Sequence, residues 1–190
     1  MKILAFAGSN REESWNWKLV RVAARLAREA GAQVTVPPPE VLNLPMVNED
    51  LVAREGYPEA ARRWKSLLVN HQGFLIASPE YNGFFTPLLK NALDWASIKE
   101  HPEEPSLQAF RGKVAALMAT SPGSLGGLRG LLMLRIQLEN LKVLVLPQQV
   151  SVPYAPRVLD KEGNLTDARR LEALRRMVQE FLELLRKLHG

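Results

Sequence analysis

The first turn of the chain carries side chains that are suited to binding a phosphate group. Residues 8–16 read Gly-Ser-Asn-Arg-Glu-Glu-Ser-Trp-Asn, so that short hydroxyl and amide groups surround one arginine. The planar guanidinium of Arg11 suits phosphate oxygens, and a strand-to-helix turn presents unpaired backbone N–H groups at the positive end of the helix dipole. These features predict an anion-binding loop. An ordinary polar loop in which Ser14 or Asn16 caps the helix fits the same residues.

The spacing of these residues differs from the sequence patterns of better-known phosphate sites. The loop contains neither the Gly-Lys-Ser/Thr of a Walker A site nor the Gly-x-Gly-x-x-Gly of Rossmann-type dinucleotide sites. The chain has no cysteine, which excludes disulfides, thiolate metal ligands and the cysteine nucleophile of low-molecular-weight tyrosine phosphatases. The three histidines, His71, His101 and His189, are scattered. We therefore expect them at the surface, and we expect no metal site.

Two later stretches also have the composition of ligand-binding loops. Pro, Asn and Gly within residues 79–83 mark a tight turn, which Phe84 and Phe85 follow. Together with Tyr81, these aromatic side chains could hold a flat ring against backbone amides or simply pack against their neighbours. In residues 121–127, the glycines permit close approach of the backbone to a ligand, although turn geometry explains them equally well.

Apolar strands and amphipathic helices alternate along the chain. Strands are predicted over residues 2–7, 33–36, 74–78, 113–120 and 142–146, and residues 149–152 extend or accompany the last one. Helices are predicted between the first loop and Gly31, over residues 58–70, 87–97 and 128–140, and after an N-cap at Thr166. This alternation predicts an α/β fold with three α/β/α layers. Its core would be a doubly wound, five-stranded parallel sheet of the flavodoxin-like order 2-1-3-4-5.

The predicted topology brings the three loops together. Each loop leaves the carboxyl end of a strand, and ligands of such sheets bind outside these ends, where the strand order reverses between strands one and three. The first two loops leave these two strands, and the third loop leaves the next strand. All three are therefore expected to meet at one crevice. A ligand with a phosphate at one end and a flat ring at the other fits this arrangement, and FMN is such a ligand.

Three segments outside the loops carry further expectations. Residues 37–56 lack periodicity and are predicted to form a functional rim, whereas residues 99–111 are predicted to form a charged surface loop. The helix over residues 128–140 is apolar around nearly its whole circumference, which indicates burial on two sides. We expect one side to cover the sheet and the other to form a homodimer interface.

The composition predicts a single globular domain over residues 1–190. Of the 190 residues, 46% are hydrophobic and 24% are charged, and no apolar run is long enough to span a bilayer. No signal peptide is expected, because a strand begins directly after Met1, and the expected location is the cytoplasm. The net charge of +5 raises the question of nucleic-acid binding, but the basic residues alternate with acidic ones on helices. Solvated helix faces are therefore favoured, and the charge would also attract an anionic cofactor.

Three motifs, in order, resemble those of the NADPH-dependent FMN reductases, a family of flavodoxin-like proteins. They are Gly8-Ser9-x-Arg11-x-x-Ser14-x-Asn16-x-x-Leu19, then Pro79-Glu80-Tyr81-Asn82-Gly83 with Leu89-Lys90-Asn91-Ala92-Leu93-Asp94-Trp95, and then Ser121-x-Gly123 with Gly126-Gly127. The resemblance covers nearly the whole chain. It implies an enzyme that binds FMN and transfers hydride from NADPH or NADH, through flavin N5, to a small acceptor. Such acceptors are quinones, free flavins, azo or nitro compounds, and chromate.

The resemblance also implies roles for individual residues. The FMN phosphate would be held by Ser9, Arg11, Ser14, Asn16 and the backbone of Trp15. The isoalloxazine would be lined by Pro79, Glu80, Tyr81, Asn82 and Gly83, with Glu80 orienting the loop, and the other side of the pocket would be closed by Ser121, Pro122 and Gly123. No side chain is assigned as a catalytic acid or base, because the flavin carries the hydride. A homodimer or homotetramer is expected.

Two other functions fit the same residues. A flavodoxin-like electron carrier or a flavin-binding regulatory protein would bind the cofactor without NAD(P)H turnover, although such carriers are usually acidic and this chain carries a charge of +5. A module that binds a phosphate-bearing ligand without flavin would use the first loop alone.

Overall fold

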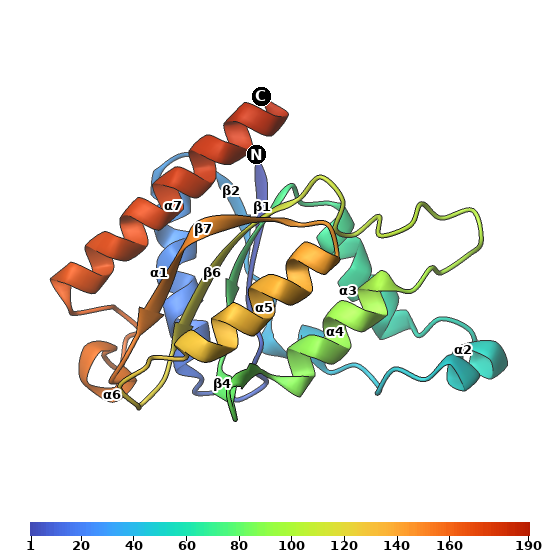
Figure 1. Ribbon diagram of the computed structural model, residues 1–190, viewed down its shortest axis with the longest axis horizontal. Coiled ribbons are helices and arrows are strands. Elements are labelled where there is room, and N and C mark those ends of the chain that lie inside the picture. The colour runs from blue at the N-terminus through green and yellow to red at the C-terminus, as the bar shows by residue number, and fades with distance from the viewer.

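A parallel sheet of five strands forms the centre of the computed structural model, which describes residues 1–190 (Figure 1). The strands are β1 (Lys2–Ala7), β2 (Gln33–Thr35), β3 (Gly73–Ala77), β6 (Val114–Thr120) and β7 (Leu144–Val152). They lie in the order β2-β1-β3-β6-β7, which is the predicted 2-1-3-4-5 order of the five strands. The flavodoxin-like fold class predicted from the sequence is therefore confirmed.

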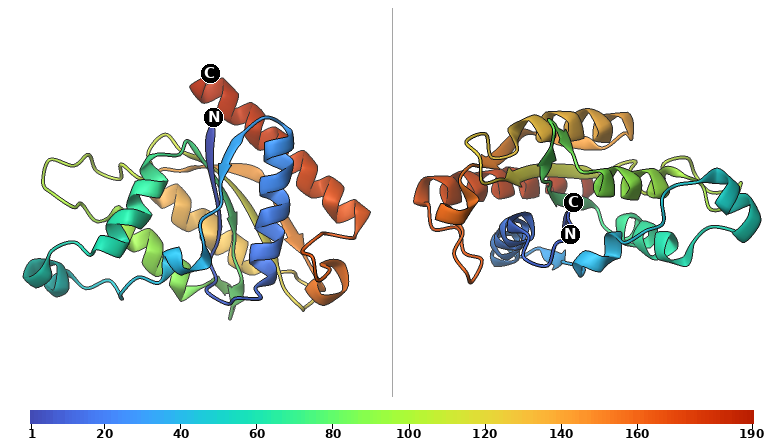
Figure 2. Two further views of the ribbon diagram at one scale, coloured as in Figure 1. Left: turned by 180° about the vertical axis from the view of Figure 1, so that it is seen from behind. Right: turned by 90° about the horizontal axis from the view of Figure 1, so that it is seen from below.

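Helices cover both faces of the sheet (Figures 1 and 2). On one face, α1 (Trp15–Glu29) packs beside α7 (Ala168–His189), and on the other lie α3 (Glu59–Val69), α4 (Pro87–Ser97) and α5 (Leu128–Asn140). The central strands are buried on both sides, which explains their almost continuous apolar sequence. No helix combines the length and the apolar character needed to cross a membrane.

A short antiparallel hairpin, β4 (Glu80–Tyr81) and β5 (Phe84–Phe85), forms where the sequence predicted only a tight turn. Its two central residues, Asn82 and Gly83, have φ angles of 53° and 87°. Two-residue hairpin turns require this left-handed backbone, and asparagine followed by glycine is the preferred pair for it. The turn prediction was therefore correct, and the flanking pairs extend it into a hairpin.

The structure differs from the predictions at several element ends. Asp167, and not Thr166, caps α7, because its carboxylate accepts a hydrogen bond of 3.0 Å from the backbone N–H of Arg170. The connection over residues 37–56 contains a 3₁₀ turn, η1 (Pro39–Leu42), and a short helix, α2 (Glu49–Glu55). A further short helix, α6 (Ala155–Val158), follows β7.

His71 is buried, which contradicts the prediction of a surface position. One ring nitrogen lies 2.6 Å from the carbonyl oxygen of Leu67, and the other lies 2.8 Å from Thr35 Oγ1. The imidazole therefore joins the end of α3 to β2. It is a structural residue with both nitrogens satisfied, and its bond to Thr35 joins residues 36 positions apart.

The segment over residues 99–111 is a mostly exposed loop, as predicted, and a buried ion pair anchors it. Glu104 forms a salt bridge with Lys65 of α3, and each side chain is only 6% exposed. Glu104 also accepts a hydrogen bond of 2.7 Å from the Glu100 N–H. Burial alone would raise the pKa of the Glu104 carboxyl, but the hydrogen bonds from Lys65 and from the Glu100 N–H outweigh it and hold the pKa below its ordinary value.

We expect the Glu104→Gln variant to be less stable than the wild type by about 3 kcal/mol, because Lys65 would remain buried without a counter-charge. Since the folded-state pKa of Glu104 is lowered, the ionised group contributes stability above its unfolded value near 4.5, and this contribution is lost as the pH falls through the lower folded value. Urea unfolding should therefore show a gap between variant and wild type at pH 7 that narrows at pH 3.

A double variant, Lys65→Met with Glu104→Leu, is the matched control. It removes both charges and should recover much of the lost stability. Equal stability of Glu104→Gln and the wild type at pH 7 would contradict the conclusion that the Lys65–Glu104 ion pair anchors residues 99–111.

Candidate functional site

The three predicted loops leave neighbouring strands at one edge of the sheet. Ala7 at the end of β1 pairs with Ala77 of β3, and Ala77 pairs with Met118 near the end of β6. This edge is at the bottom of Figure 1, where the start of α1, the hairpin and the chain after β6 lie. We call these segments loop 1 (residues 8–14), loop 2 (residues 78–86) and loop 3 (residues 121–127).

Loop 1 directs its first two carbonyl groups into the protein. The Gly8 carbonyl accepts a hydrogen bond of 2.7 Å from Thr86 Oγ1, and the Ser9 carbonyl accepts one of 2.6 Å from Trp17 Nε1. Gly8 has no room for a side chain, because a Cβ there would lie 2.9 Å from the Cβ of Leu89. The N–H groups of Gly8 and Ser9 also bond within the protein, so the backbone donors that remain for an anion lie at the start of α1.

The start of α1 supplies further donors. Ser14 is the buried N-cap residue, but its hydroxyl makes no capping bond, so the first backbone N–H groups of α1 lack a partner. Arg11 is exposed, and its guanidinium lies 5.9 Å from the centre of the Trp15 ring. The first turn of the helix contains no acidic residue, and Glu13 before it is paired with Lys18 at 3.2 Å. The unpaired N–H groups of the helix start and the guanidinium of Arg11 together suit a phosphate such as that of FMN.

Asn16 connects the start of α1 to the end of β6. Its Nδ2 donates to the Thr120 carbonyl and its Oδ1 accepts from the Thr120 N–H, both at 3.0 Å, and the residue is only 4% exposed. Both ends of the side-chain amide are therefore engaged within the protein. The group of Asn16 that faces an anion at the helix start is its backbone N–H.

Glu80 fastens loop 2 to the start of α5. Its side chain is 7% exposed and pairs with the Arg129 guanidinium. It also accepts hydrogen bonds from the backbone N–H groups of Arg129, at 3.1 Å, and Gly130, at 3.3 Å. Gly127, the N-cap of α5, has no side chain that could cap the helix. Glu80 supplies that cap from the hairpin, so its carboxylate orients the loop and is not free for catalysis.

The tip of the hairpin is open to solvent. Tyr81 is 54% exposed, and Asn82 beside it is also exposed, whereas Pro79 and Gly83 are half-buried. Of the aromatic residues that follow, Phe85 packs into the core and Phe84 remains exposed. The hairpin therefore exposes backbone groups and two aromatic rings, those of Tyr81 and Phe84.

Two glycines of loop 3 have backbone angles and close contacts that exclude a side chain. Gly126 and Gly127 have φ angles of 60° and 86°. A Cβ on Gly126 would lie 2.6 Å from the nitrogen of Pro153, and one on Gly127 would lie 2.7 Å from the Cβ of Ala119. Turn geometry and close packing therefore account for this pair. The predicted site residues of the loop precede it, where Ser121 is half-buried and Pro122 and Gly123 are exposed.

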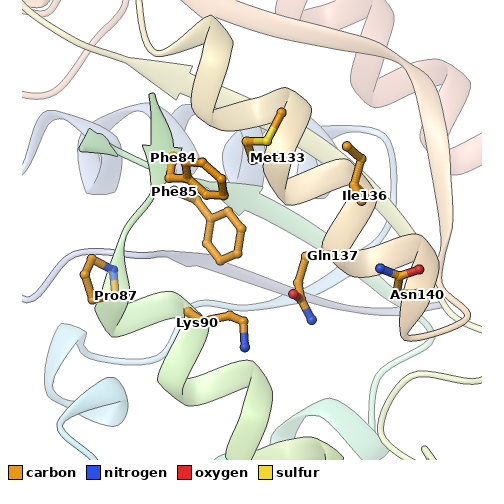
Figure 3. Close-up of a pocket in the computed structure, with 8 residues that line it drawn as sticks. All are labelled: Phe84, Phe85, Pro87, Lys90, Met133, Ile136, Gln137 and Asn140. Atoms are coloured by element: carbon orange, nitrogen blue, oxygen red, sulfur yellow. The ribbon is translucent and has the colours of Figure 1, made fainter. Parts of the chain in front are cut away.

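A groove of about 400 Å³ lies between α4 and α5, next to the hairpin (Figure 3). Aromatic and aliphatic side chains line most of it, and polar groups of both helices complete it: Phe84, Phe85, Pro87, Lys90, Met133, Ile136, Gln137 and Asn140. Beside the groove, Leu128, Leu132 and Ile136 form a stripe along the outer side of α5, with 37%, 45% and 53% exposure. The second apolar side of this helix, for which the sequence predicted a covering partner, is uncovered in the single chain.

The predicted rim over residues 37–56 is held in place by α4. Asn91 accepts a hydrogen bond from the Val47 N–H and donates one to the Pro45 carbonyl, both at 2.9 Å. Trp95 Nε1 donates to the same carbonyl at 2.6 Å. Met46 lies between these anchors and is 72% exposed. The rim is therefore a fixed segment up to this point, whereas α2 beyond it buries no residue and stands away from the sheet (Figure 1).

Three residues that position the loops were not identified from the sequence as parts of the site. Trp17 and Thr86 hydrogen-bond to carbonyls of loop 1, and the backbone of Thr120 hydrogen-bonds to the side chain of Asn16. The Thr86-Pro87 pair did signal a helix start, and Thr86 Oγ1 accepts the expected capping bond from Leu89 N–H at 3.2 Å. The bond from the same hydroxyl to Gly8 joins residues 78 positions apart, which no local pattern reveals.

Known proteins match the chain over its whole length. Residues 1–157 match the family described as NADPH-dependent FMN reductase. A NAD(P)H-dependent FMN reductase of Pseudomonas aeruginosa is 32% identical over 191 residues, which cover 100% of this chain and 98% of the relative. An NADPH:quinone oxidoreductase of Arabidopsis thaliana is 30% identical over 197 residues, with coverage of 100% and 94%.

Among solved structures, FerB of Paracoccus denitrificans, a flavoenzyme NAD(P)H:acceptor oxidoreductase, has a TM-score of 0.82 at 28% identity and covers 98% of this chain and 97% of its own. The fold, the order of the three loops along the chain and these full-length matches all indicate the same family. The chain belongs to the NADPH-dependent FMN reductase family.

Proposed function

We propose that this protein is an FMN-dependent NAD(P)H oxidoreductase that reduces a small quinone-type acceptor at the carboxyl edge of its sheet. Family membership supports the use of FMN and NAD(P)H. The full-length relative that is a quinone oxidoreductase supports the acceptor class. The structural observation that carries the proposal is the hydrogen bonding of loop 1. The carbonyls of Gly8 and Ser9 bond inward to Thr86 and Trp17, and the first N–H groups of α1, which follow the loop, have no partner in the chain.

The proposed division of roles follows from the contacts of each loop. Ser9, Arg11 and Ser14, together with the backbone N–H groups of Trp15 and Asn16, bind the FMN phosphate. The segment from Pro79 to Gly83, including Glu80, Tyr81 and Asn82, lines the isoalloxazine. On the other side of the ring lie Ser121, Pro122 and Gly123. The buried side chains of Asn16 and Glu80 keep these segments at fixed separations.

The protein's contribution to the reaction is binding, orientation and access. When bound, FMN accepts hydride from NAD(P)H and passes it to the acceptor. The backbone donors at the start of α1 fix the position of the cofactor through its phosphate, and the open hairpin tip leaves room for a second planar molecule. No side chain is proposed as a catalytic acid or base.

A spectroscopic experiment tests this function. We expect the purified protein to retain a yellow flavin after incubation with FMN and desalting, to lose the colour on anaerobic addition of NADPH, and to regain it on addition of a benzoquinone. Retained flavin that stays oxidised with both NADPH and NADH would instead indicate an electron carrier or regulatory protein. A colourless protein would indicate a phosphate-binding module without flavin.

The Arg11→Ala variant tests the phosphate site. We expect it to weaken FMN binding by about 1–3 kcal/mol, the usual loss for a hydrogen bond to a charged group. Fluorescence titration measures the dissociation constants for FMN and for riboflavin, which lacks the phosphate and should be unaffected. Arg111→Ala is the matched control, because Arg111 is equally charged and exposed but lies before β6, at the opposite edge of the sheet. An unchanged FMN affinity of Arg11→Ala would contradict the phosphate assignment.

We propose further that the chain forms one domain and assembles as a homodimer or homotetramer. One buried cluster that draws on four strands of the sheet, and against which Val34 of β2 packs, supports the single domain. The apolar groove between α4 and α5 and the exposed stripe of α5 support a second copy as the covering partner.

The Ile136→Asp variant tests this assembly, because it places a charge in both the stripe and the groove. We expect light scattering at micromolar concentration to find an oligomer for the wild type and a monomer for Ile136→Asp. The control is Leu188→Asp near the end of α7, where the leucine is 52% exposed, comparable to the 53% of Ile136, but far from the groove. A monomeric wild type would show that the stripe has no such partner.

A further inference from the structure

The chain that follows β7 runs along loop 3. The Ala155 N–H donates to the Ser121 carbonyl at 3.0 Å, and the Tyr154 N–H donates to the Gly123 carbonyl at 3.3 Å. Ser121 follows Thr120, which Asn16 holds to the start of α1. Tyr154 is therefore separated from the donor-rich start of α1 only by residues 120–123.

The same segment also contacts α1 directly. A Cβ on Gly163 would lie 3.5 Å from Cγ of Lys18, and Arg25 Nη1 donates to Asn164 Oδ1 at 3.3 Å. In Figure 1, α6 lies next to the lower end of α1 and to the chain after β6. Residues 153–164 therefore form a border of the site on the side opposite the hairpin.

Tyr154 combines a strained backbone with an exposed ring. Its φ and ψ of 57° and 44° lie in the left-handed region, which residues with a Cβ rarely adopt. The residue is 41% exposed, and its hydroxyl makes no hydrogen bond within the chain. Core packing therefore does not explain why an aromatic residue occupies this position. Such strained positions occur preferentially at ligand-binding sites.

Arg157 is a cation without a counter-charge. Its guanidinium lies 5.5 Å from the centre of the Tyr154 ring, and no carboxylate lies within salt-bridge distance of it. Asp160, the nearest acidic residue along the chain, is occupied by hydrogen bonds from the Asn164 N–H at 2.7 Å and from Asn164 Nδ2 at 3.1 Å. Contact with the ring holds the planar cation in one place while its N–H donors remain free.

This pair repeats the arrangement of Arg11 on Trp15 in loop 1. We propose that Arg157, positioned by the Tyr154 ring, is a second phosphate-binding residue of the crevice. Its ligand is a phosphate monoester of a nucleotide, either the 2′-phosphate of NADPH or the terminal phosphate of FMN, for which a planar guanidinium is well suited. The inference rests on the proposed function, because that reaction supplies both nucleotides.

The Arg157→Ala variant distinguishes the two sources of phosphate. If the ligand is the 2′-phosphate, the KM for NADPH should rise about 10-fold while the KM for NADH and the kcat stay unchanged. If the ligand is the FMN phosphate, the Kd for FMN should rise about 10-fold while the Kd for riboflavin stays unchanged. Arg111→Ala, with the same loss of charge at the opposite edge, should leave the two KM values and the two Kd values, four constants in all, at their wild-type values.

The proposal is overturned if Arg157→Ala keeps all four constants within about twofold of the wild type. It is equally overturned if all four change together, or if Arg111→Ala produces the same change, since either result would show a general effect of charge. Failure of the proposed function would look different, because the wild type itself would then neither retain FMN nor oxidise NADPH.

Two variants of Tyr154 test the positioning role of the ring. Tyr154→Gly removes the ring while tolerating the left-handed backbone, and it should show the same selective loss as Arg157→Ala to a smaller degree. Tyr154→Phe keeps the ring and should restore wild-type constants. Wild-type constants for Tyr154→Gly would show that the ring does not position Arg157.

Discussion

The inward hydrogen bonding of the loop 1 carbonyls is the constraint on which the rest of the site depends. A turn between a strand and a helix presents acceptors as well as donors, and a phosphate is attracted only where the donors dominate. Thr86 and Trp17 bind the carbonyls of Gly8 and Ser9 from inside the protein. The helix dipole of α1 and the guanidinium of Arg11 then act on the open side without competition from these two carbonyls.

The same contacts join the three loops in pairs. Thr86 connects loop 2 to loop 1, Asn16 connects the start of α1 to the strand that leads into loop 3, and Glu80 connects loop 2 to the helix that leaves loop 3. All three side chains are largely buried. Because the loops are held before any ligand arrives, binding of a cofactor costs little ordering of the protein. Asn16 and Glu80, which the sequence motifs suggest as cofactor ligands, therefore also hold the loops in position.

The surfaces around these loops differ in what they can bind. Tyr81 at the hairpin tip is exposed beside the crevice, and the groove between α4 and α5 is mostly apolar. On the other side, the border formed by residues 153–164 carries Arg157, which forms no salt bridge and lies over the Tyr154 ring. An apolar surface suits a hydrophobic partner, and an unpaired guanidinium suits an anionic group of a nucleotide.

Local patterns in the sequence determined the strands and most of the helices, and with them the sheet order and the edge at which the loops meet. Periodicity, the Thr86-Pro87 helix start and the Asn82-Gly83 turn act within a few residues, so they can be read directly from the chain. Composition likewise excluded cysteine chemistry. The types of residue in loop 1 predicted an anion site, and the fold places that loop at the expected edge.

Only the tertiary structure decided which polar groups remain free and which are used inside the protein. Asn16 and Thr120 are 104 positions apart, and the burial of His71 and of the Lys65–Glu104 pair depends on how helices pack over the sheet. A side chain's hydrogen-bonding capacity is set by its type, but its partner is set by packing between distant segments. The sequence therefore determined the candidates for the site, and the packing of the chain determined which of them face a ligand.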